Sequence, residues 1–336
     1  MSRTARGSFS FENGIGILGW ASSAGKKESE GPLGGEFDLT FRDNLLGEDS
    51  WEKAESRIQF ETVRQCLENS GLSPDEFDAI FSGDLLNQCI ASTFGIRGLG
   101  IPQIGMYGAC STMALTMLSA ALALESGSAQ RCIAVTSSHF SSAERQFRNP
   151  LQYGGQRTPT AQWTVTGAGA VALGKGGGIA ITSATVGIIQ DFGIKDVNNM
   201  GAAMAPAAAS TIERHLDAFD ADAADYDLIM TGDLGFVGSE LLLQLLRRDG
   251  VDIGSVHNDG GMMIYNREKQ DVHAGGSGCG CSASVLCAHV LPRLACGELR
   301  RVLFVGTGAL QSPTSSFQGE SVPSIAHAVE LRAVLK

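Results

Sequence analysis

An internal repeat is the sequence feature that most restricts how this chain folds. Residues 77–85 resemble residues 226–234, and both segments read as a short apolar strand that ends in Gly-Asp-Leu. Later in each half, at 108–135 and at 278–305, a turn with a cysteine precedes an apolar helix, a glycine, and an arginine that opens another strand. Strands and helices in this order are typical of βαβ units with mostly parallel strands. Short apolar strands also resemble one another by chance, but the shared order favours a duplicated chain.

The length of 336 residues fits two fused halves better than one small core. The glycine run 176–178 joins two predicted strands, so we expect an N-terminal half at residues 1–178 and a C-terminal half at residues 179–336. Residues 50–70 carry apolar side chains at helical spacing and are followed by Gly71, which predicts an amphipathic helix with a glycine C-cap.

Charge and hydropathy argue against several classes of protein. The net charge of −11 opposes binding to nucleic acid, whose partners usually carry clustered Lys and Arg. No run approaches the roughly 18 to 20 apolar residues of a membrane span, and residues 1–30 lack the apolar core of a signal peptide. We therefore expect a soluble chain without a transmembrane segment and without a nucleic-acid partner.

The 8 cysteines are spread through predicted core segments of a large chain, so we expect reduced thiols and no disulfide framework. Cys279 and Cys281 form the only close pair in the sequence. A zinc site there would need two further ligands, and the nearby Cys287 and His289 fall on a predicted apolar helix. We therefore expect neither a metal ion nor a cofactor.

Cys110 lies at a turn between a predicted strand that begins at Ile101 and a predicted helix that reaches Leu124. A sulfur at the N-terminus of a buried helix faces the positive end of the helix dipole and unpaired backbone N–H groups. Such a position favours a thiolate nucleophile or a bound anion. The alternative is a small apolar residue that fills the junction, since free cysteine is among the most buried residue types.

These features resemble the thiolase fold, the duplicated five-layered α-β-α-β-α architecture of thiolases and ketoacyl-acyl-carrier-protein synthases. The resemblance implies an α/β fold with mixed, mostly parallel sheets. It puts Cys110 at the place of the acyl-accepting cysteine, and Cys279 at the place of a catalytic His or Asn on the turn 276–284. His257 is the candidate for the other catalytic histidine, although the Gln-Ala-Asn that usually follows is absent. Loss of one such donor typically lowers the rate by about 10²–10³, so a thiol at residue 279 argues against an efficient condensing enzyme.

Longer matches indicate one family within this superfamily. The matching segments together span essentially the whole chain: residues 31–34, 83–88, 108–112, 136–139, 143–148, 153–155, 163–167, 180–187 and 273–279. They resemble the stage V sporulation protein AD family of endospore-forming bacteria. That resemblance implies binding of dipicolinic acid (pyridine-2,6-dicarboxylate), free or as its calcium chelate, for its uptake into the forespore and its release in germination.

The same resemblance implies a place in the cell and an assembly. It implies a location in the forespore or spore, peripheral to the inner membrane, and docking to integral membrane proteins of the same sporulation and germination system. Thiolase-like proteins pair through the strand before the nucleophile turn, here near residues 101–107, so we expect a homodimer.

The charge pattern independently indicates an anion pocket. No Asp or Glu occurs between Glu144 and Asp191, and Arg145 and Arg148 open this interval. Arginine binds a planar carboxylate with two parallel hydrogen bonds. Two alternatives remain: part of the interval is buried sheet with no room for charge, or Arg145 or Arg148 simply pairs with Glu144.

Other candidate ligand contacts follow strand ends, where open α/β sheets bind ligands. His139 follows the predicted strand 133–138, and a structural role is the alternative for this lone histidine. Near another strand end we expect Asp84 to order the turn, because Asp233 repeats it in the other half. The candidate ligand-binding residues are Asn87, Gln88, Cys110, Ser111, His139, Arg145, Arg148, His257 and Cys279.

Three hypotheses follow from the sequence. The leading one is a noncatalytic binding protein for dipicolinic acid, in which Cys110 forms a wall of the pocket. The alternative is a thioester-dependent acyltransferase that uses Cys110 as its nucleophile. A purely structural adaptor for membrane channel proteins is the third.

Overall fold

The computed structural model describes residues 2–147 and 156–334. The first half contains the strands β1 (Ser2–Ala5), β2 (Ser8–Ala24), β3 (Leu39–Thr40), β4 (Ala79–Gly83), β5 (Gln103–Gly105), β6 (Cys132–Ser138), β7 (Trp163–Thr164) and β8 (Gly167–Gly174). Its helices are α1 (Lys26–Ser29), α2 (Trp51–Ser70), α3 (Ile90–Ile96), α4 (Thr112–Glu125) and α5 (Phe140–Phe147), with 3₁₀ turns η1 (Pro74–Glu76), η2 (Asn87–Cys89) and η3 (Arg97–Leu99).

The second half contains the strands β9 (Ile179–Thr185), β10 (Leu228–Thr231), β11 (His257–Asp259), β12 (Gly276–Ser277), β13 (Arg301–Ala309) and β14 (Ser324–Ala333). Its helices are α6 (Met200–Phe219), α7 (Gly235–Arg248), α8 (Gly260–Met263), α9 (Cys279–Val285), α10 (Leu291–Ala295) and α11 (Pro313–Phe317). A 3₁₀ turn η5 (Ala223–Asp225) precedes β10, and one π-helical stretch η6 (Leu286–Val290) joins α9 to α10.

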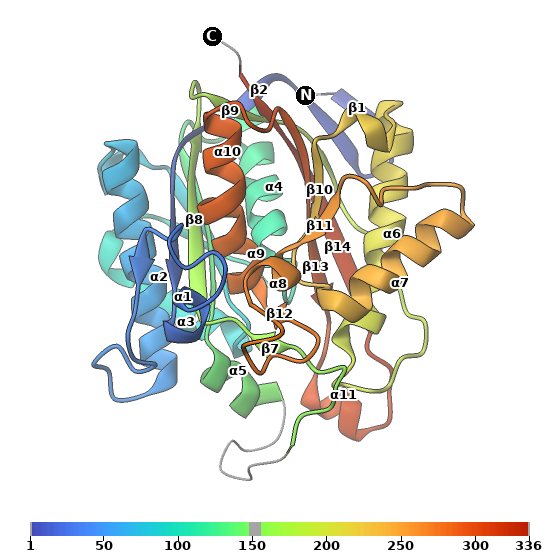
Figure 1. Ribbon diagram of the computed structural model, residues 1–336. Helices are drawn as coiled ribbons and strands as arrows, with labels where there is room; N and C mark the ends of the chain where they lie inside the picture. The colour runs from blue at the N-terminus through green and yellow to red at the C-terminus, as the bar shows by residue number, and fades with distance from the viewer. Residues whose placement is uncertain (1, 148–155, 335–336) are drawn as a thin grey trace.

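The elements stack in five layers, as Figure 1 shows. Helices α2 and α3 cover the outer face of one sheet, α6 and α7 cover the outer face of the other, and α4, α9 and α10 lie between the sheets. This is the α-β-α-β-α arrangement that the sequence predicts. Helix α4 is apolar around its circumference because it packs against both sheets, and its buried side chains join the largest apolar cluster of the core.

The strand order repeats between the halves. It runs β5-β4-β6-β8-β2 in the first half and β11-β10-β13-β14-β9 in the second, and the antiparallel pair β2–β9 joins the two into one continuous sheet. The three outer strands of each half are parallel, whereas β8, β2, β14 and β9 pair in antiparallel fashion. The sheets are therefore mixed, and the repeat seen in the sequence corresponds to a repeated topology.

Local signals in the sequence account for the ends of α2. The Ser50 hydroxyl accepts a hydrogen bond from the Lys53 N–H at 3.4 Å, and Gly71 ends the helix with a φ of 68°. Glycine adopts this left-handed conformation more readily than other residues. The predicted glycine C-cap is therefore confirmed.

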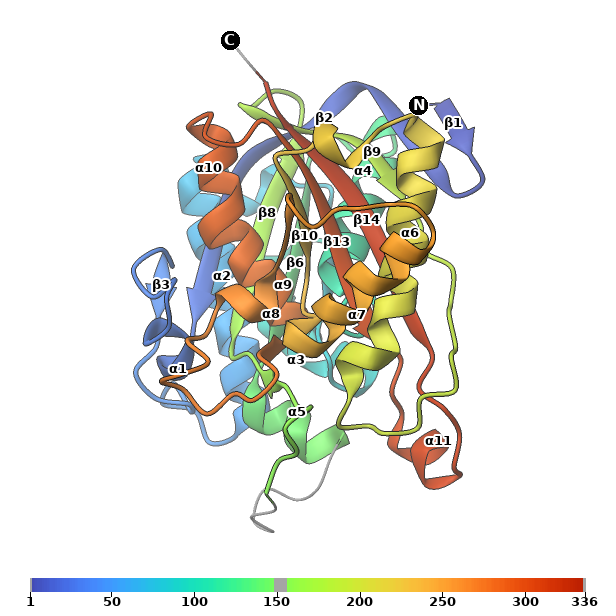
Figure 2. The same cartoon turned by 45° about the vertical axis from the view of Figure 1, so that its right-hand side comes forward.

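The turns that build the candidate site gather at one end of the molecule. In two views turned by 45°, α5 and α11 lie at this same end (Figure 1 and Figure 2). Helix α5 follows β6, and α11 belongs to the connection between β13 and β14. This end therefore combines chain segments from both halves.

Candidate functional site

Cys110 sits on a tight turn that leads into α4. Ala109 adopts a φ of 50°, and the Ser111 N–H donates to the Gly108 carbonyl at 3.1 Å. The Thr112 hydroxyl accepts from the Gly108 N–H at 3.1 Å, which closes the turn from the helix side. The strand, turn and buried helix that the sequence predicts around Cys110 are confirmed, with the helix beginning at Thr112.

A second cysteine reaches the same place from the other half of the chain. Cys279 opens α9, and its thiol donates to the Ser137 carbonyl at 3.0 Å. Cys110 and Cys279 belong to one small apolar cluster with Leu85 and Ala143. The structure thus brings these two predicted site residues together.

Asp233 is the acidic group of the second half whose charge acts on Cys110. It follows β10 and is 0% exposed, and its negative charge disfavours ionisation of the Cys110 thiol by raising its pKa. Its carboxyl accepts from the Thr307 hydroxyl and from the Gly278 N–H, each at 2.7 Å. Burial raises the pKa of Asp233 to about 6, although these hydrogen bonds oppose the rise.

The environment of Cys110 does not favour a thiolate. Burial raises the pKa of the Cys110 thiol well above its ordinary value, and the charge of Asp233 raises it further. Of the alternatives that the sequence left open for Cys110, the burial of the sulfur favours an unactivated thiol. The helix start contributes fixed partial charges, but loss of water and the charge of Asp233 outweigh them.

A small cavity opens beside Cys110. Its volume is about 40 Å³, close to the roughly 30 Å³ that one water molecule occupies and well below the roughly 150 Å³ of a cavity that holds a benzene ring. Its walls come from both halves and carry one carboxyl, that of Glu144: Leu85, Tyr107, Ala109, Cys110, Ala143, Glu144, Phe147, Thr164, Met200, Ser277, Ala309 and Gln311. A ring-sized ligand enters only when side chains at the mouth move outward.

Neighbouring candidates have other partners. The Ser111 hydroxyl donates to the Gly108 carbonyl at 2.6 Å, so it stabilises the turn. The Asn87 side chain accepts from the Gln146 amide at 3.1 Å, and Gln88 is exposed with a φ of 57°. As expected, Asp84 orders its own turn by accepting from N–H groups that include that of Leu86. Among these residues none lines the cavity beside Cys110.

His139 is buried and both of its ring nitrogens have backbone partners. Its Nε2 lies 2.7 Å from the Asn44 carbonyl oxygen, and its Nδ1 accepts from the Ser141 N–H at 3.1 Å. Burial lowers the pKa of this histidine. The geometry favours the structural role that the sequence left open as the alternative.

The arginine candidates do not reach the cysteine cluster in the described part of the chain. Arg145 forms an ion pair with Glu52 and lies over the ring of Trp51, with 5.3 Å from its Cζ to the ring centroid. It therefore pairs with Glu52 of α2, and the alternative pairing of Glu144 with one of the two arginines stays a prediction. Arg148 lies outside the described residues.

His257 does not line the cavity beside Cys110. It lies on β11, where its Nε2 is 3.0 Å from the Thr231 hydroxyl, and burial lowers its pKa to about 4. Asp233, which the repeat marks only as a turn residue, is the acidic group whose charge acts on Cys110. The signal was present in the shared Gly-Asp-Leu, but the sequence did not show which of the two copies acts on Cys110.

The described ranges, 2–147 and 156–334, contain neither a metal-binding cluster nor a membrane-spanning helix. No group of three or more His, Cys, Asp or Glu side chains is arranged there to hold a metal ion. No helix in these ranges combines the length and the apolar character needed to cross a lipid bilayer. His289, which the sequence placed near the close cysteine pair, has its Nδ1 2.8 Å from the Glu36 carboxylate.

Solved structures share this fold at low sequence identity. The 3-oxoacyl-acyl-carrier-protein synthase III of Aquifex aeolicus VF5 superposes with a TM-score of 0.57 at 12% identity, covering 95% of this chain and 100% of that one. OleA of Xanthomonas campestris with cerulenin superposes with a TM-score of 0.60 at 12% identity and 99% coverage of both chains. These likenesses confirm the thiolase-like fold.

Sequence relatives identify the family. The family model described as Stage V sporulation protein AD (SpoVAD) matches residues 5–332. Stage V sporulation protein AD of Bacillus subtilis (strain 168) is 46% identical over 330 residues, which cover 98% of this chain and 97% of that protein. The two matches extend over nearly the whole chain, through both halves and the site between them. This chain belongs to the stage V sporulation protein AD family.

Proposed function

We propose that this chain is a noncatalytic binding protein for dipicolinic acid, which it holds during uptake into the forespore and release in germination. Its membership in a sporulation family supports the setting. The observation that carries the proposal is the state of Cys110, a buried thiol in a cavity whose described walls include no histidine, lysine or arginine. Thioester chemistry needs a base that removes the thiol proton, and the described walls supply no imidazole or amine for this role; their one carboxyl is that of Glu144.

The charges around the cavity favour a neutral ligand. Its described walls carry no cation, so a bare dianion would lose its hydration there without gaining a positive partner from them. The calcium chelate of dipicolinate carries two positive and two negative charges and avoids this cost. We therefore take the calcium chelate as the bound form, with Tyr107, Phe147 and Gln311 moving outward to admit the pyridine ring.

Isothermal titration calorimetry tests this proposal with dipicolinate in the presence and in the absence of calcium. We expect binding that is stronger with calcium, and a loss of about tenfold or more in Ala143→Leu, which fills the cavity. The matched controls are Cys66→Ala, a buried cysteine in a separate cluster, and Arg145→Ala, whose guanidinium pairs with Glu52. Both should bind like the wild type. No binding at millimolar ligand would contradict the proposal.

The assembly belongs to the same proposal. The chain acts at the inner membrane of the spore, docked to integral membrane proteins of the same system, and pairs with a second copy of itself. An exposed strand edge at β5 supports the pairing. Membrane docking has its support in the family resemblance alone.

The acyltransferase alternative makes an opposite prediction. The fold shared with 3-oxoacyl-acyl-carrier-protein synthase III is the observation that favours it. Incubation with acyl-coenzyme A followed by mass spectrometry of the intact chain decides between the two. An acyl adduct on Cys110 would overturn the noncatalytic reading, and we expect none.

A further inference from the structure

Helix α5 closes the cavity beside Cys110 from one side. It supplies three of the residues that line the cavity, Ala143, Glu144 and Phe147. With α5 in this position the cavity measures about 40 Å³, and the Cys110 side chain is 5% exposed. We propose that the last turn of α5 is a hinged flap that opens the cavity, and that the Gln311 amide is the latch that holds it shut. The inference rests on the proposed function, because a ring-sized ligand has to pass this wall.

The start of α5 is held firmly. The Phe140 ring stacks on the Trp163 ring, with 3.8 Å between the ring centroids and 7° between the ring planes. The Phe140 N–H donates to the Thr166 hydroxyl at 3.1 Å, and the buried Ser142 hydroxyl donates to the buried Glu55 carboxyl of α2 at 2.6 Å. Breaking a buried hydrogen bond of this kind is costly, because neither partner then finds water. The first turn of α5 is therefore the fixed point of the flap.

The end of α5 is held more weakly. The Gln146 amide donates to the Asn87 side chain at 3.1 Å in an exposed contact. The Gln311 amide donates to the Phe147 carbonyl at 3.3 Å, and both of these residues are only partly buried. Water replaces hydrogen bonds of this kind when they open, so each contributes little to stability. The last turn of α5 is therefore free to move outward while the first turn stays in place.

Gln311 joins the two halves of the chain at the mouth of the cavity. It lies in the second half, between β13 and α11, and it also lines the cavity. Figure 1 and Figure 2 show α5 and α11 at the same end of the molecule. The Gln311 amide thus connects a wall from the second half to the last residue of α5. Loss of this one donor releases the flap without disturbing its fixed point.

The experiment measures how fast N-ethylmaleimide, a small cyclic reagent, modifies Cys110 without ligand, read by peptide mass spectrometry. Its rate follows the fraction of time that the flap is open. The test variant is Gln311→Met, which keeps the length of the side chain and removes the donor. We expect it to raise the rate at Cys110 about fivefold, the effect of losing one ordinary hydrogen bond. Cys66, a buried thiol in a separate apolar cluster, should keep its wild-type rate. The matched control is Gln318→Met, at an exposed glutamine just after α11, and it should match wild type at both thiols.

A wild-type rate at Cys110 in Gln311→Met would overturn the proposal, and so would an equal rise at Cys66 or in Gln318→Met, which would indicate general loosening. Hydrogen exchange gives a second readout. The peptide that contains α5 should exchange faster in Gln311→Met than in wild type, while the peptide that contains α4 keeps its rate; an unchanged α5 peptide contradicts the proposal. Neither measurement uses dipicolinate, so a failure here is distinct from a failure of the binding proposal.

Discussion

At the scale of single residues, glycines on β13 set how closely the two halves meet at Cys110. A Cβ on Gly308 would lie 2.4 Å from the Gly108 carbonyl oxygen, and a Cβ on Gly306 would lie 2.8 Å from the Ala114 Cβ. Both distances are shorter than van der Waals contact. The second half therefore touches the turn that carries Cys110 only because these strand positions have no side chain.

Gly308→Ala is expected to lower the free energy of unfolding by about 2 kcal/mol, because the added methyl group overpacks a contact between two backbones. Urea unfolding followed by circular dichroism measures the change. Gly178→Ala is the matched control, since a Cβ there meets no atom within 4 Å. Equal stability of the two variants would show that the halves do not meet this closely.

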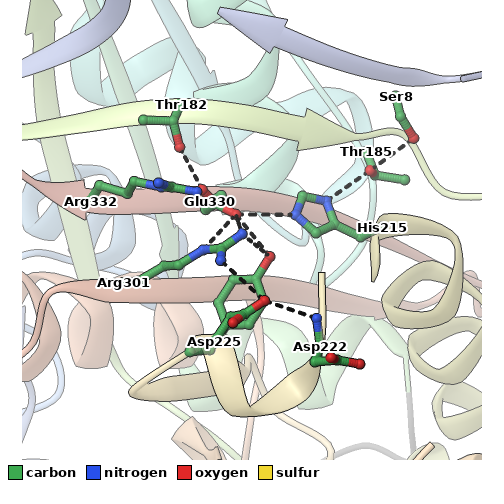
Figure 3. A network of polar contacts seen from close by, with 10 residues as sticks. Ser8, Thr182, Thr185, His215, Asp222, Asp225, Arg301, Glu330 and Arg332 are labelled. Atoms are coloured by element: carbon green, nitrogen blue, oxygen red, sulfur yellow. Dashed lines mark hydrogen bonds and ion pairs between the residues drawn. The ribbon is translucent and has the colours of Figure 1, made fainter. Parts of the chain in front are cut away.

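At the scale of elements, a buried carboxylate on β14 links several strands and one helix. Glu330 is 2% exposed, and Figure 3 shows the side chains that converge on it. Its carboxylate accepts hydrogen bonds from Thr182 Oγ1 at 2.8 Å, Tyr226 OH at 2.8 Å, Arg301 Nη2 at 2.9 Å and Arg332 Nε at 2.6 Å, and lies 3.7 Å from His215 Nε2. Burial alone would raise the pKa of Glu330, but these partners outweigh it and hold the pKa well below its usual range.

The first half has uncharged side chains at the positions equivalent to this buried network. Ala172 pairs with Ile133 on β6 as Glu330 pairs with Leu303 on β13, and these strands are equivalent in the two halves. The internal repeat also aligns the covering helix α2 with α6, and the residues before β4 with those before β10. Where the second half has His215, Tyr226 and Glu330, the first half has Cys66, Phe77 and Ala172.

Glu330→Gln is expected to lower the free energy of unfolding at pH 7 by about 3 kcal/mol, because it leaves the part-buried Arg301 guanidinium without the buried carboxylate that pairs with it. The pKa of Glu330 in the folded chain lies below the value of about 4.3 expected in the unfolded chain. Its contribution is therefore present above that pH and is lost as the pH falls below it. The difference between wild type and variant should shrink between pH 5 and pH 3, measured by urea unfolding at each pH.

Two further variants separate the buried network from general charge effects. Glu320→Gln removes an exposed carboxylate from the connection between β13 and β14, and we expect it to match wild type. The triple variant His215→Cys, Tyr226→Phe, Glu330→Ala copies the first half and should recover part of the stability that Glu330→Gln loses. A triple variant less stable than the single one would show that the two halves pack differently here.

At the scale of the whole molecule, β5 ends the sheet of the first half with an exposed edge. It pairs only with β4 among the described strands, and its Ile104 side chain is 45% exposed. Phe94 on the adjacent α3 is 50% exposed, and Tyr107, just after β5, is 46% exposed. An edge strand with apolar neighbours is a natural site for pairing with a second copy.

Ile104→Lys is expected to convert a dimer into a monomer, because it places a charge on each side of the paired edges. Sedimentation velocity at micromolar concentrations measures the assembly state. Phe317→Lys, which changes the 91% exposed phenylalanine of α11, is the matched control and should remain dimeric. A monomeric wild type, or a dimer in Ile104→Lys, would contradict the proposed pairing.

The sequence was informative wherever the decisive interactions are local. It predicted α2 with its Gly71 cap, the turn and helix at Cys110, and the repeated strand order, since these depend on apolar spacing and glycine positions. It left the state of Cys110 open because the helix start is visible in the sequence whereas the burial of the sulfur is not. It could not place Arg145, whose partner Glu52 lies on a distant helix.

The sequence by itself determined the duplicated βαβ organisation, because apolar periodicity and glycine turns are local features of the chain, and its resemblance to known proteins implied the five-layered fold and the family. Only the tertiary structure decided what surrounds the central sulfur. Cys279 comes from the second half and reaches Cys110 through the packing of two sheets against shared helices. Contacts of this kind depend on how closely the layers approach one another. The side-chain volume at positions such as Gly308 sets that distance, and no local sequence pattern reveals it.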